Sequence, residues 1–328
     1  MTSITDTAVT TAVPPDTGSA DGSLPHPPGP MPMPGTAVDP PADVDAIAAA
    51  VRLLAGSPDH RVLRRIAETT LPVTATTAAE PVRVGVVVDV ETEGIDPAAH
   101  GIIELAMRRF QFDALGRIVA VGKPRCWRED PERPLDPAVT RLTGLTDTDL
   151  AGQSIDEVTA TKVLRSADVV IAHHAAFDRP RVERRLPGAA GRPWACSLAE
   201  VPWGELGFES RRLGHLLMEM GWFHDGHRAE TDILALLHVL AHRCSDGTTL
   251  LGRLIAQAET VSVRVEVYGS PYAVKDRLKS RGYRWDADRS FWWTEVRTLA
   301  VEPEQLWLQR QGCRPPRLVP VTWTNRHR

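Results

Sequence analysis

The chain has 328 residues, a formal net charge of −4 and 42% hydrophobic residues, which is typical of a globular protein with about two domains. It contains no run of about 18 apolar residues and does not open with a basic segment followed by an apolar one, which argues against a membrane-spanning helix and a signal peptide. The four cysteines lie far apart, so we expect neither a structural zinc site nor a disulfide framework, and we predict a cytoplasmic protein without membrane contact.

The first part of the chain is acidic and rich in proline. Residues 1–50 contain six Asp and no Lys or Arg, and six prolines crowd together between positions 25 and 34. Proline at that density removes backbone donors from helices and sheets, so we predict that residues 1–42 form a disordered tail. Residues 43–81 are expected to hold a helical segment, with a second short helix near Val62, Leu63 and Ile66, followed by a linker.

Residues 82–245 are predicted to form the main domain. The apolar, β-branched run over 82–89 is typical of a central strand. Further strands are expected over 102–112, 118–122 and 168–172, and helices over 137–144, 156–166, around Val182 and Leu186, over 212–220 and over 230–242. Three strands followed by alternating helices and strands predict an α/β sandwich with a mixed sheet, and residues 246–260 are expected to be a linker.

Residues 261–328 are predicted to be a small separate module. They hold 13 Lys and Arg against 7 Asp and Glu, so this end of the chain is basic. Residues 261–268 alternate between apolar and polar, which indicates a strand, and Ser270 and Pro271 begin a helix. Two aromatic segments flank a turn at 286–289, which indicates a hairpin and a β-α-β-β order. The last 15 or so residues contain three prolines and are expected to be irregular.

Two acids lie at the end of the predicted central strand. Asp89 and Glu91 are two residues apart, so their side chains point to the same face. Carboxylate oxygens are the ligands that Mg²⁺ and Mn²⁺ prefer. A pair of solvated acids at a strand end is the alternative at this point.

Two further acids lie where predicted helices begin. Asp178 follows the strand at 168–172, and Asp232 opens an apolar helix. Each could instead complement a helix dipole. His227 precedes Asp232 by five residues, which in a continuous helix would set the two side chains about 140° apart. We therefore place His227 in the preceding loop, where the role of general base suits it.

The four carboxylates would repel one another if the fold brought them together without cations. Two divalent ions about 3.5–4 Å apart would neutralise the acids and would bind the attacking and leaving oxygens of a phosphodiester. The sequence therefore favours two Mg²⁺ or Mn²⁺ ions as cofactors.

Three motifs together resemble the DnaQ-like 3′–5′ exonucleases of the DEDDh type, which include the proofreading epsilon subunit of bacterial DNA polymerase III. They read Val-Val-Asp89-Val-Glu91-Thr-Glu-Gly94, then Val-Ile-Ala-His-His-Ala-Ala-Phe-Asp178, then His227-Arg-Ala-Glu-Thr-Asp232. Residues 134–147 also look like the stretch that precedes the family's second motif. The resemblance covers residues 82–245, about half of the chain.

The resemblance implies a ribonuclease H-like fold in which Asp89, Glu91, Asp178 and Asp232 bind the metals and His227 activates water. Most family members have Asn at the position of His174, which lies near the substrate in this family; Phe177 and Thr92 are expected to be further substrate contacts. The implied activity is hydrolysis of DNA from single-stranded 3′ ends, in replication or repair, with release of nucleoside 5′-monophosphates and with a DNA polymerase as a possible partner.

Two other functions remain open at this point. One is an exoribonuclease that trims RNA 3′ ends, because the reading of a 2′-hydroxyl is not visible in the sequence. The other is a nucleic-acid-binding or polymerase-associated accessory protein without enzymatic activity. For that role the basic module and the proline-rich tail are the relevant features.

The module at 261–328 resembles a small module appended to some bacterial exonucleases. Its basic residues interleave with aromatic ones, as in sites where single strands stack, and we expect nucleic-acid contacts at Lys275, Arg284, Trp285 and Trp292. The alternative is that the tryptophans are the core of a very small domain.

Overall fold

The computed structural model describes residues 44–75, 81–96 and 98–328, so the predicted disordered tail at 1–42 lies outside the described residues. The chain divides into two units, residues 1–57 and residues 58–328. In the first unit, helix α1 (Val44–Ala55) confirms the predicted helical segment. None of its residues is buried, and Val44 and Leu53 are more than three-quarters exposed.

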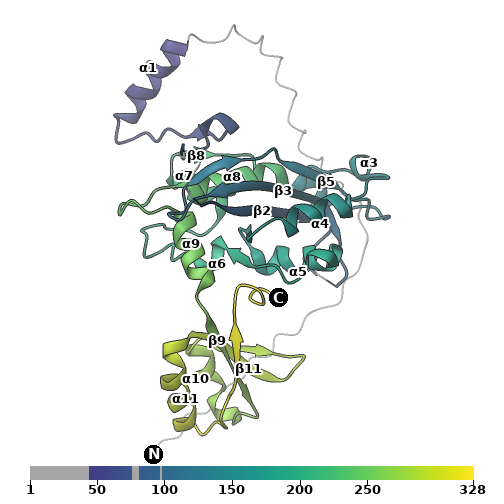
Figure 1. The fold of residues 1–328 in the computed structure, drawn as a ribbon, viewed down its shortest axis with the longest axis vertical. Helices are drawn as coiled ribbons and strands as arrows, with labels where there is room; N and C mark the ends of the chain where they lie inside the picture. The colour runs from purple at the N-terminus through teal and green to yellow at the C-terminus, as the bar shows by residue number, and fades with distance from the viewer. Residues whose placement is uncertain (1–43, 76–80, 97) are drawn as a thin grey trace, which may run out of the picture. The chain divides into compact units, whose positions relative to one another are not determined.

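The second unit is built on a six-stranded mixed sheet, drawn in Figure 1. Its strand order is β4-β3-β2-β6-β7, and β5 also pairs with β3. Strand β2 pairs antiparallel with β3 and parallel with β6. The strands are β2 (Arg83–Thr92), β3 (Ile102–Phe112), β4 (Ile118–Val121), β5 (Arg125–Arg128), β6 (Val169–Ala172) and β7 (Trp194–Cys196). The mixed α/β architecture is as predicted.

Helices cover both faces of this sheet. On one face, Val87 of β2 packs with α8 (Ala229–Ala241), α7 (Leu213–Glu219) and α9 (Leu250–Glu259). On the other face, Val86 and Val88 pack with α4 (Glu157–Arg165) and α5 (Ala175–Arg185). The alternation of a strand therefore places Asp89 and Glu91 on the face of Val87, which α8 covers.

Short elements complete this part of the unit. They are α2 (Pro137–Thr143), α3 (Asp147–Leu150), α6 (Ser197–Glu200) and the 3-10 turns at Glu68–Thr70 and Pro187–Ala189. Helix α2 confirms the predicted helix, because Gly144 caps it in the left-handed conformation at φ 72°. Within the described ranges, no helix is long and apolar enough to cross a membrane.

Two predictions about connecting segments are wrong. The short helix expected near Val62, Leu63 and Ile66 is instead strand β1 (Arg64–Arg65), which pairs in parallel with β8 (Trp222–Phe223). Residues 246–260 are not a linker, because α9 occupies most of that range. Its apolar positions recur at helical spacing and are buried against the sheet: Leu250, Leu251, Leu254, Ile255 and Ala258.

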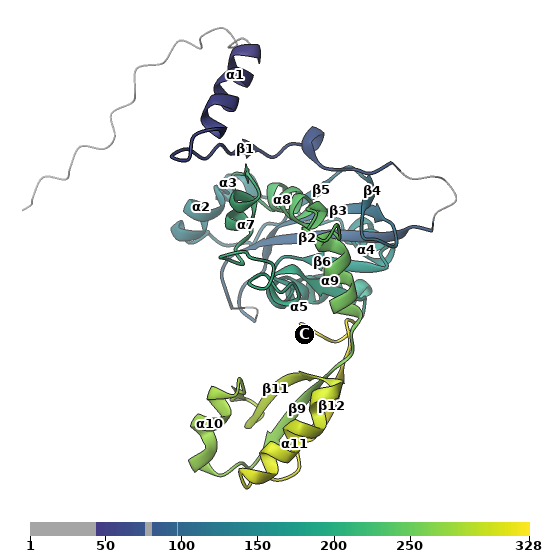
Figure 2. The same ribbon diagram turned by 90° about the vertical axis from the view of Figure 1, so that its left-hand side faces the viewer.

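A second sheet of four strands forms the C-terminal module, which we define as residues 261–321, in the order β10-β11-β9-β12. The strands are β9 (Ser262–Tyr268), β10 (Arg284–Asp286), β11 (Phe291–Arg297) and β12 (Arg317–Val321). Helices α10 (Lys275–Ser280) and α11 (Val301–Arg310) contribute Leu278 and Leu308 to one core with Val265 and Val267 of β9 (Figure 2). The 3-10 turns Tyr272–Val274 and Thr298–Ala300 precede the two helices.

The predicted β-α-β-β order describes β9 to β11, whereas α11 and β12 were not predicted. The expectation of an irregular end is wrong for residues 317–321. Strand β12 tolerates Pro320 because it lies at the edge of the sheet, where a missing N–H leaves no neighbouring strand unpaired.

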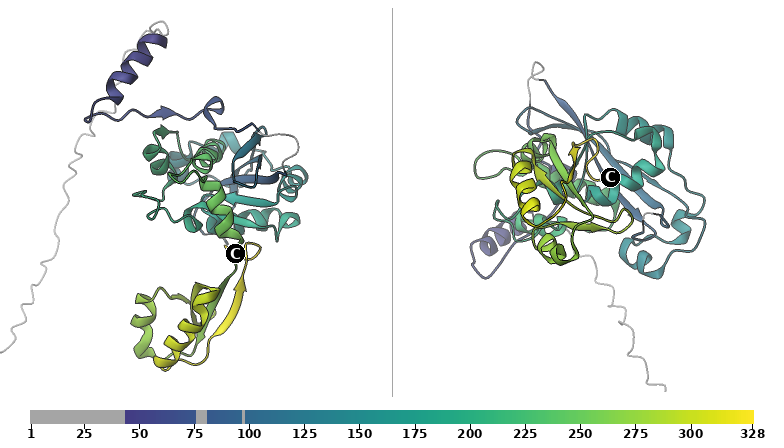
Figure 3. Two further views of the ribbon diagram at one scale, coloured as in Figure 1. Left: turned by 60° about the vertical axis from the view of Figure 1, so that its left-hand side comes forward. Right: turned by 90° about the horizontal axis from the view of Figure 1, so that it is seen from below.

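The last seven residues, 322–328, which we call the C-terminal segment, lie against the first sheet and its helices (Figure 3). The Trp194 N–H donates to the Trp323 carbonyl over 2.8 Å. Arg179, which is fully buried, donates to the carbonyl of Arg326 over 2.6 Å. Arg326 in turn forms a buried ion pair with Glu200, with 2.6 Å between Nη1 and Oε1.

Candidate metal centre

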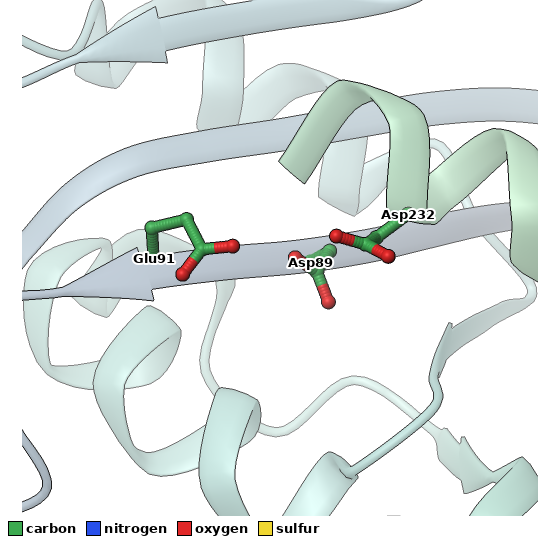
Figure 4. Close-up of side chains that lie close together, drawn as sticks. All are labelled: Asp89, Glu91 and Asp232. Carbon is green, nitrogen blue, oxygen red and sulfur yellow. The ribbon is translucent and has the colours of Figure 1, made fainter. Parts of the chain in front are cut away.

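Three of the four predicted metal-binding acids meet where β2 ends beneath α8. Asp89 and Glu91 project from β2, and Asp232 projects from the first turn of α8, as Figure 4 shows. One carboxylate oxygen of each lies within 4.8 Å of one from each of the others. Such a group of oxygen donors matches the preference of hard divalent cations.

Burial and mutual charge repulsion raise the pKa values of Asp89 and Glu91. Burial raises the pKa of Asp89 well above its ordinary value, and the negative charges of Asp178, Asp232 and Glu91 raise it further. Burial, together with the charges of Asp232 and Glu104, raises the pKa of Glu91 to about 8. Deprotonation of Asp89 and Glu91 is therefore unfavourable without a nearby positive charge, which a divalent metal ion would supply, so these residues fit such an ion.

The fourth predicted acid, Asp178, is buried in the first turn of α5 and is not part of the three-residue group. Burial raises the pKa of Asp178 to about 7, although the backbone N–H of Val90 donates to it. The negative charge of Asp178 is the second cause of the raised pKa of Asp89, and the Val90 N–H that donates to Asp178 belongs to the residue after Asp89 in β2.

An acid that the sequence analysis missed, Glu104 on β3, fixes the start of α8. It is 1% exposed and lies directly across the strand pair from Glu91. It accepts hydrogen bonds from the Ala229 N–H over 3.0 Å and from the Arg228 guanidinium over 3.2 Å. The Arg228 N–H also donates to Asp232 Oδ2 over 3.1 Å. Glu104 therefore positions the turn that carries Asp232, and the available signal was an acid within the otherwise apolar first six residues of β3.

Two histidines precede α8, and they differ in their surroundings. His227 is exposed in the loop, as predicted, with a left-handed φ of 65°. Its ring has no hydrogen bond or ion pair to any residue that the structure describes. His224, which the sequence analysis did not single out, is almost buried, and its Nε2 lies 2.8 Å from Asp232 Oδ1. In this conformation His224, not His227, contacts the acidic group.

The second motif forms a stack beside Asp178. The rings of His174 and Phe177 are nearly parallel, with 5.9 Å between centroids, and the Arg181 guanidinium lies 3.6 Å from the Phe177 centroid. His174 is exposed, whereas Arg181 is buried and donates to the Phe177 carbonyl over 2.8 Å. Thr92, the third expected substrate contact, is buried and donates its hydroxyl to the Gly94 carbonyl over 2.7 Å. Only His174 thus presents an open surface.

One family model and several solved structures are similar to parts of this chain. Residues 86–240 match the family model RNase_T, described as exonuclease. The comparison with curated proteins found no match. The chain is similar to exonuclease X in complex with 5′-overhanging duplex DNA, at 20% identity and a TM-score of 0.37, over 51% of this chain and 99% of that one.

Two structures of exonuclease I are also similar. One has 15% identity and a TM-score of 0.45, and the other, from E. coli in complex with a dA16 oligonucleotide, has 14% identity and a TM-score of 0.42. Each match covers 71% of this chain and 68% of that one. The family match spans the four predicted acids, Glu104 and the two histidines that precede α8. The match to the exonuclease family model thus covers the segment that carries the three DnaQ-like motifs.

Proposed function

We propose that the protein is a metal-dependent 3′–5′ exonuclease that hydrolyses phosphodiester bonds at the 3′ ends of single-stranded DNA and releases nucleoside 5′-monophosphates. The observation that carries this proposal is the group of Asp89, Glu91 and Asp232 within the family's domain. Three carboxylates held within 4.8 Å have little structural purpose without a cation, because each raises the energy of its neighbours.

The same acids define where a metal would bind. Asp89, Glu91 and Asp232 would hold divalent ions, with Asp178 contributing from α5. When bound, such ions stabilise negative charge on a phosphodiester and lower the pKa of a bound water. Glu104 and His224 would act by positioning Asp232. Glu104 binds the backbone at the start of α8, and His224 contacts the Asp232 carboxylate itself.

His227 is proposed as the general base. It lies in the loop directly before α8, and its ring forms no hydrogen bond or ion pair with the described residues that would have to break before it moved. Its imidazole would take the proton of the attacking water, and solvent would protonate the leaving 3′-oxygen. A positioned base of this kind contributes about 10²–10⁴-fold to the rate.

The test is degradation of a 5′-labelled single-stranded DNA in Mn²⁺, with wild type and Asp89→Ala compared and a matching RNA run alongside. We expect a ladder that shortens from the 3′ end in the wild type alone, and chromatography of the released product should identify nucleoside 5′-monophosphates. Equal cleavage by Asp89→Ala, or loss of the label as a mononucleotide, would contradict the proposal. If the RNA is degraded faster than the DNA, RNA becomes the proposed substrate.

A further inference from the structure

A pocket of about 400 Å³ opens on the C-terminal module, between the turn after β9, helix α10 and the β10–β11 hairpin. This volume lies within the range of small-molecule sites, about 300–1,000 Å³. The residues that matter here are Tyr272, Lys275, Lys279, Trp285 and Trp292, which all line it. The family domain at 86–240 does not include any of them.

The aromatic residues give the pocket a fixed wall and an open face. Trp285 and Trp292 are directly opposed across the hairpin, with 5.3 Å between ring centroids. Trp292 is 7% exposed and belongs to the module's core, so it forms the fixed wall of the pocket. Trp285 is 50% exposed and Tyr272 is 80% exposed, so both offer ring surface to a ligand.

Two lysines add positive charge to the same pocket. Lys275 and Lys279 are four residues apart on α10, so they project from one side of that helix. The Lys275 ammonium lies 2.6 Å from the Tyr272 hydroxyl and 4.3 Å from the centre of its ring. The chain has only four lysines, and two of them are here.

The module's buried acids do not neutralise these two lysines. Glu304 pairs with Arg281, and Glu266 pairs with Arg264 and Arg317. Neither Lys275 nor Lys279 forms an ion pair within residues 44–75, 81–96 and 98–328. Their charges are therefore available for an anionic ligand.

We propose that this pocket binds a nucleotide of a single-stranded nucleic acid, with the base against Trp285 and Tyr272 and the phosphate at Lys275 and Lys279. A planar ring system and an anion are the two chemistries that the lining can satisfy together, and a nucleotide carries both. An acidic peptide would use the lysines but would leave the exposed indole face without a planar partner. None of the pocket residues belongs to the acidic group, so this would be a second contact with the nucleic acid. The proposal deepens the proposed function and rests on it for the nature of the substrate.

The experiment measures binding of a fluorescein-labelled single-stranded DNA by the full chain in EDTA, where cleavage does not interfere. Trp285→Ala should weaken binding at least about fivefold without changing its salt dependence, because stacking is the interaction lost. Trp285→Phe, which keeps an aromatic face, should restore most of that loss. Lys275→Ala/Lys279→Ala should weaken binding and should lower the slope of log affinity on log salt by about 1.4.

The control is Arg310→Ala/Arg314→Ala, which removes two exposed charges from the same module outside the pocket. Selective loss in the pocket variants supports the proposal. Wild-type binding by the pocket variants, equal loss in the control, or no binding by the wild type would overturn it. Cleavage of a short oligonucleotide in Mn²⁺ is measured separately, so an inactive but binding protein refutes only the proposed nuclease function.

Discussion

Replacing Glu91 with Gln should stabilise the metal-free protein near neutral pH while abolishing exonuclease activity. The pKa of Glu91 is raised from 4.5 to about 8 in the native state, so the native protein binds more protons than the unfolded chain between these values. Stability contributed by this group is present below pH 4.5, is lost as pH rises and is fully lost above about pH 8. At about 1.4 kcal/mol for each tenfold change in proton affinity, the contribution of Glu91 to the free energy of unfolding falls by about 3 kcal/mol between pH 4.5 and pH 7.

Glu91→Gln removes the ionisable group with little change in shape, so the variant should not lose stability from this position as pH rises. In EDTA at pH 7, we expect the variant to melt about 5–10 °C above the wild type, and at pH 4.5 we expect the two to melt together. Mg²⁺ or Mn²⁺ should raise the wild-type melting temperature and should have a smaller effect on the variant.

The measurement is thermal unfolding followed by circular dichroism at several pH values, with and without the metal. Glu205→Gln is a matched control, because Glu205 is exposed and lies outside the acidic group. The reasoning fails if Glu91→Gln and wild type melt together at pH 7 in EDTA, or if the difference between their melting temperatures shrinks as pH rises from 5 to 8.

Three further changes test other parts of the structure. Glu104→Gln should lower the free energy of unfolding by about 1.5–3 kcal/mol in urea titrations, because it weakens charged hydrogen bonds at the start of α8, and it should weaken metal binding by calorimetry. His227→Ala should lower kcat by about 10²–10⁴-fold in steady-state kinetics while the metal-induced rise in melting temperature stays as in the wild type; an unchanged kcat would remove the assigned base. Arg326→Met should cost about 3–5 kcal/mol by urea unfolding, because the buried Glu200 would lose its arginine partner and keep only His327 and the Cys196 N–H beside it, and wild-type stability would show that this ion pair contributes nothing.

Elements long enough to show a repeating hydrophobic pattern could be predicted from the sequence. Strand β3 begins and ends at the predicted residues, and α8 lies within one residue of its predicted range. Strands β5 and β7 have four and three residues, too few to show alternation. Their conformation depends on pairing with β3 and β6, which only the assembled sheet supplies.

The residues of the candidate site also differ in how far a local sequence pattern could predict them. Acids at a strand end and a helix start predicted that Asp89, Glu91 and Asp232 would meet, because the layered fold brings such positions to one place. Glu104 and His224 could not be found in this way. Their roles depend on how α8 packs across β3 and on where the preceding loop turns back, and neither depends on a local pattern.

The C-terminal segment at 322–328 makes the completion of the proposed nuclease domain depend on the order of synthesis. The buried Glu200 leaves the ribosome 126 residues before Arg326, its ion-pair partner. At about 5–20 residues per second, that charge waits roughly 6–25 s without its partner, while the whole C-terminal module is translated. A message that stops early within the module therefore yields a nuclease domain with an unpaired buried carboxylate, which proteolysis would remove in preference to the longer product. We therefore expect a long-lived copy of the proposed nuclease domain only after the C-terminal module and the C-terminal segment have both been made.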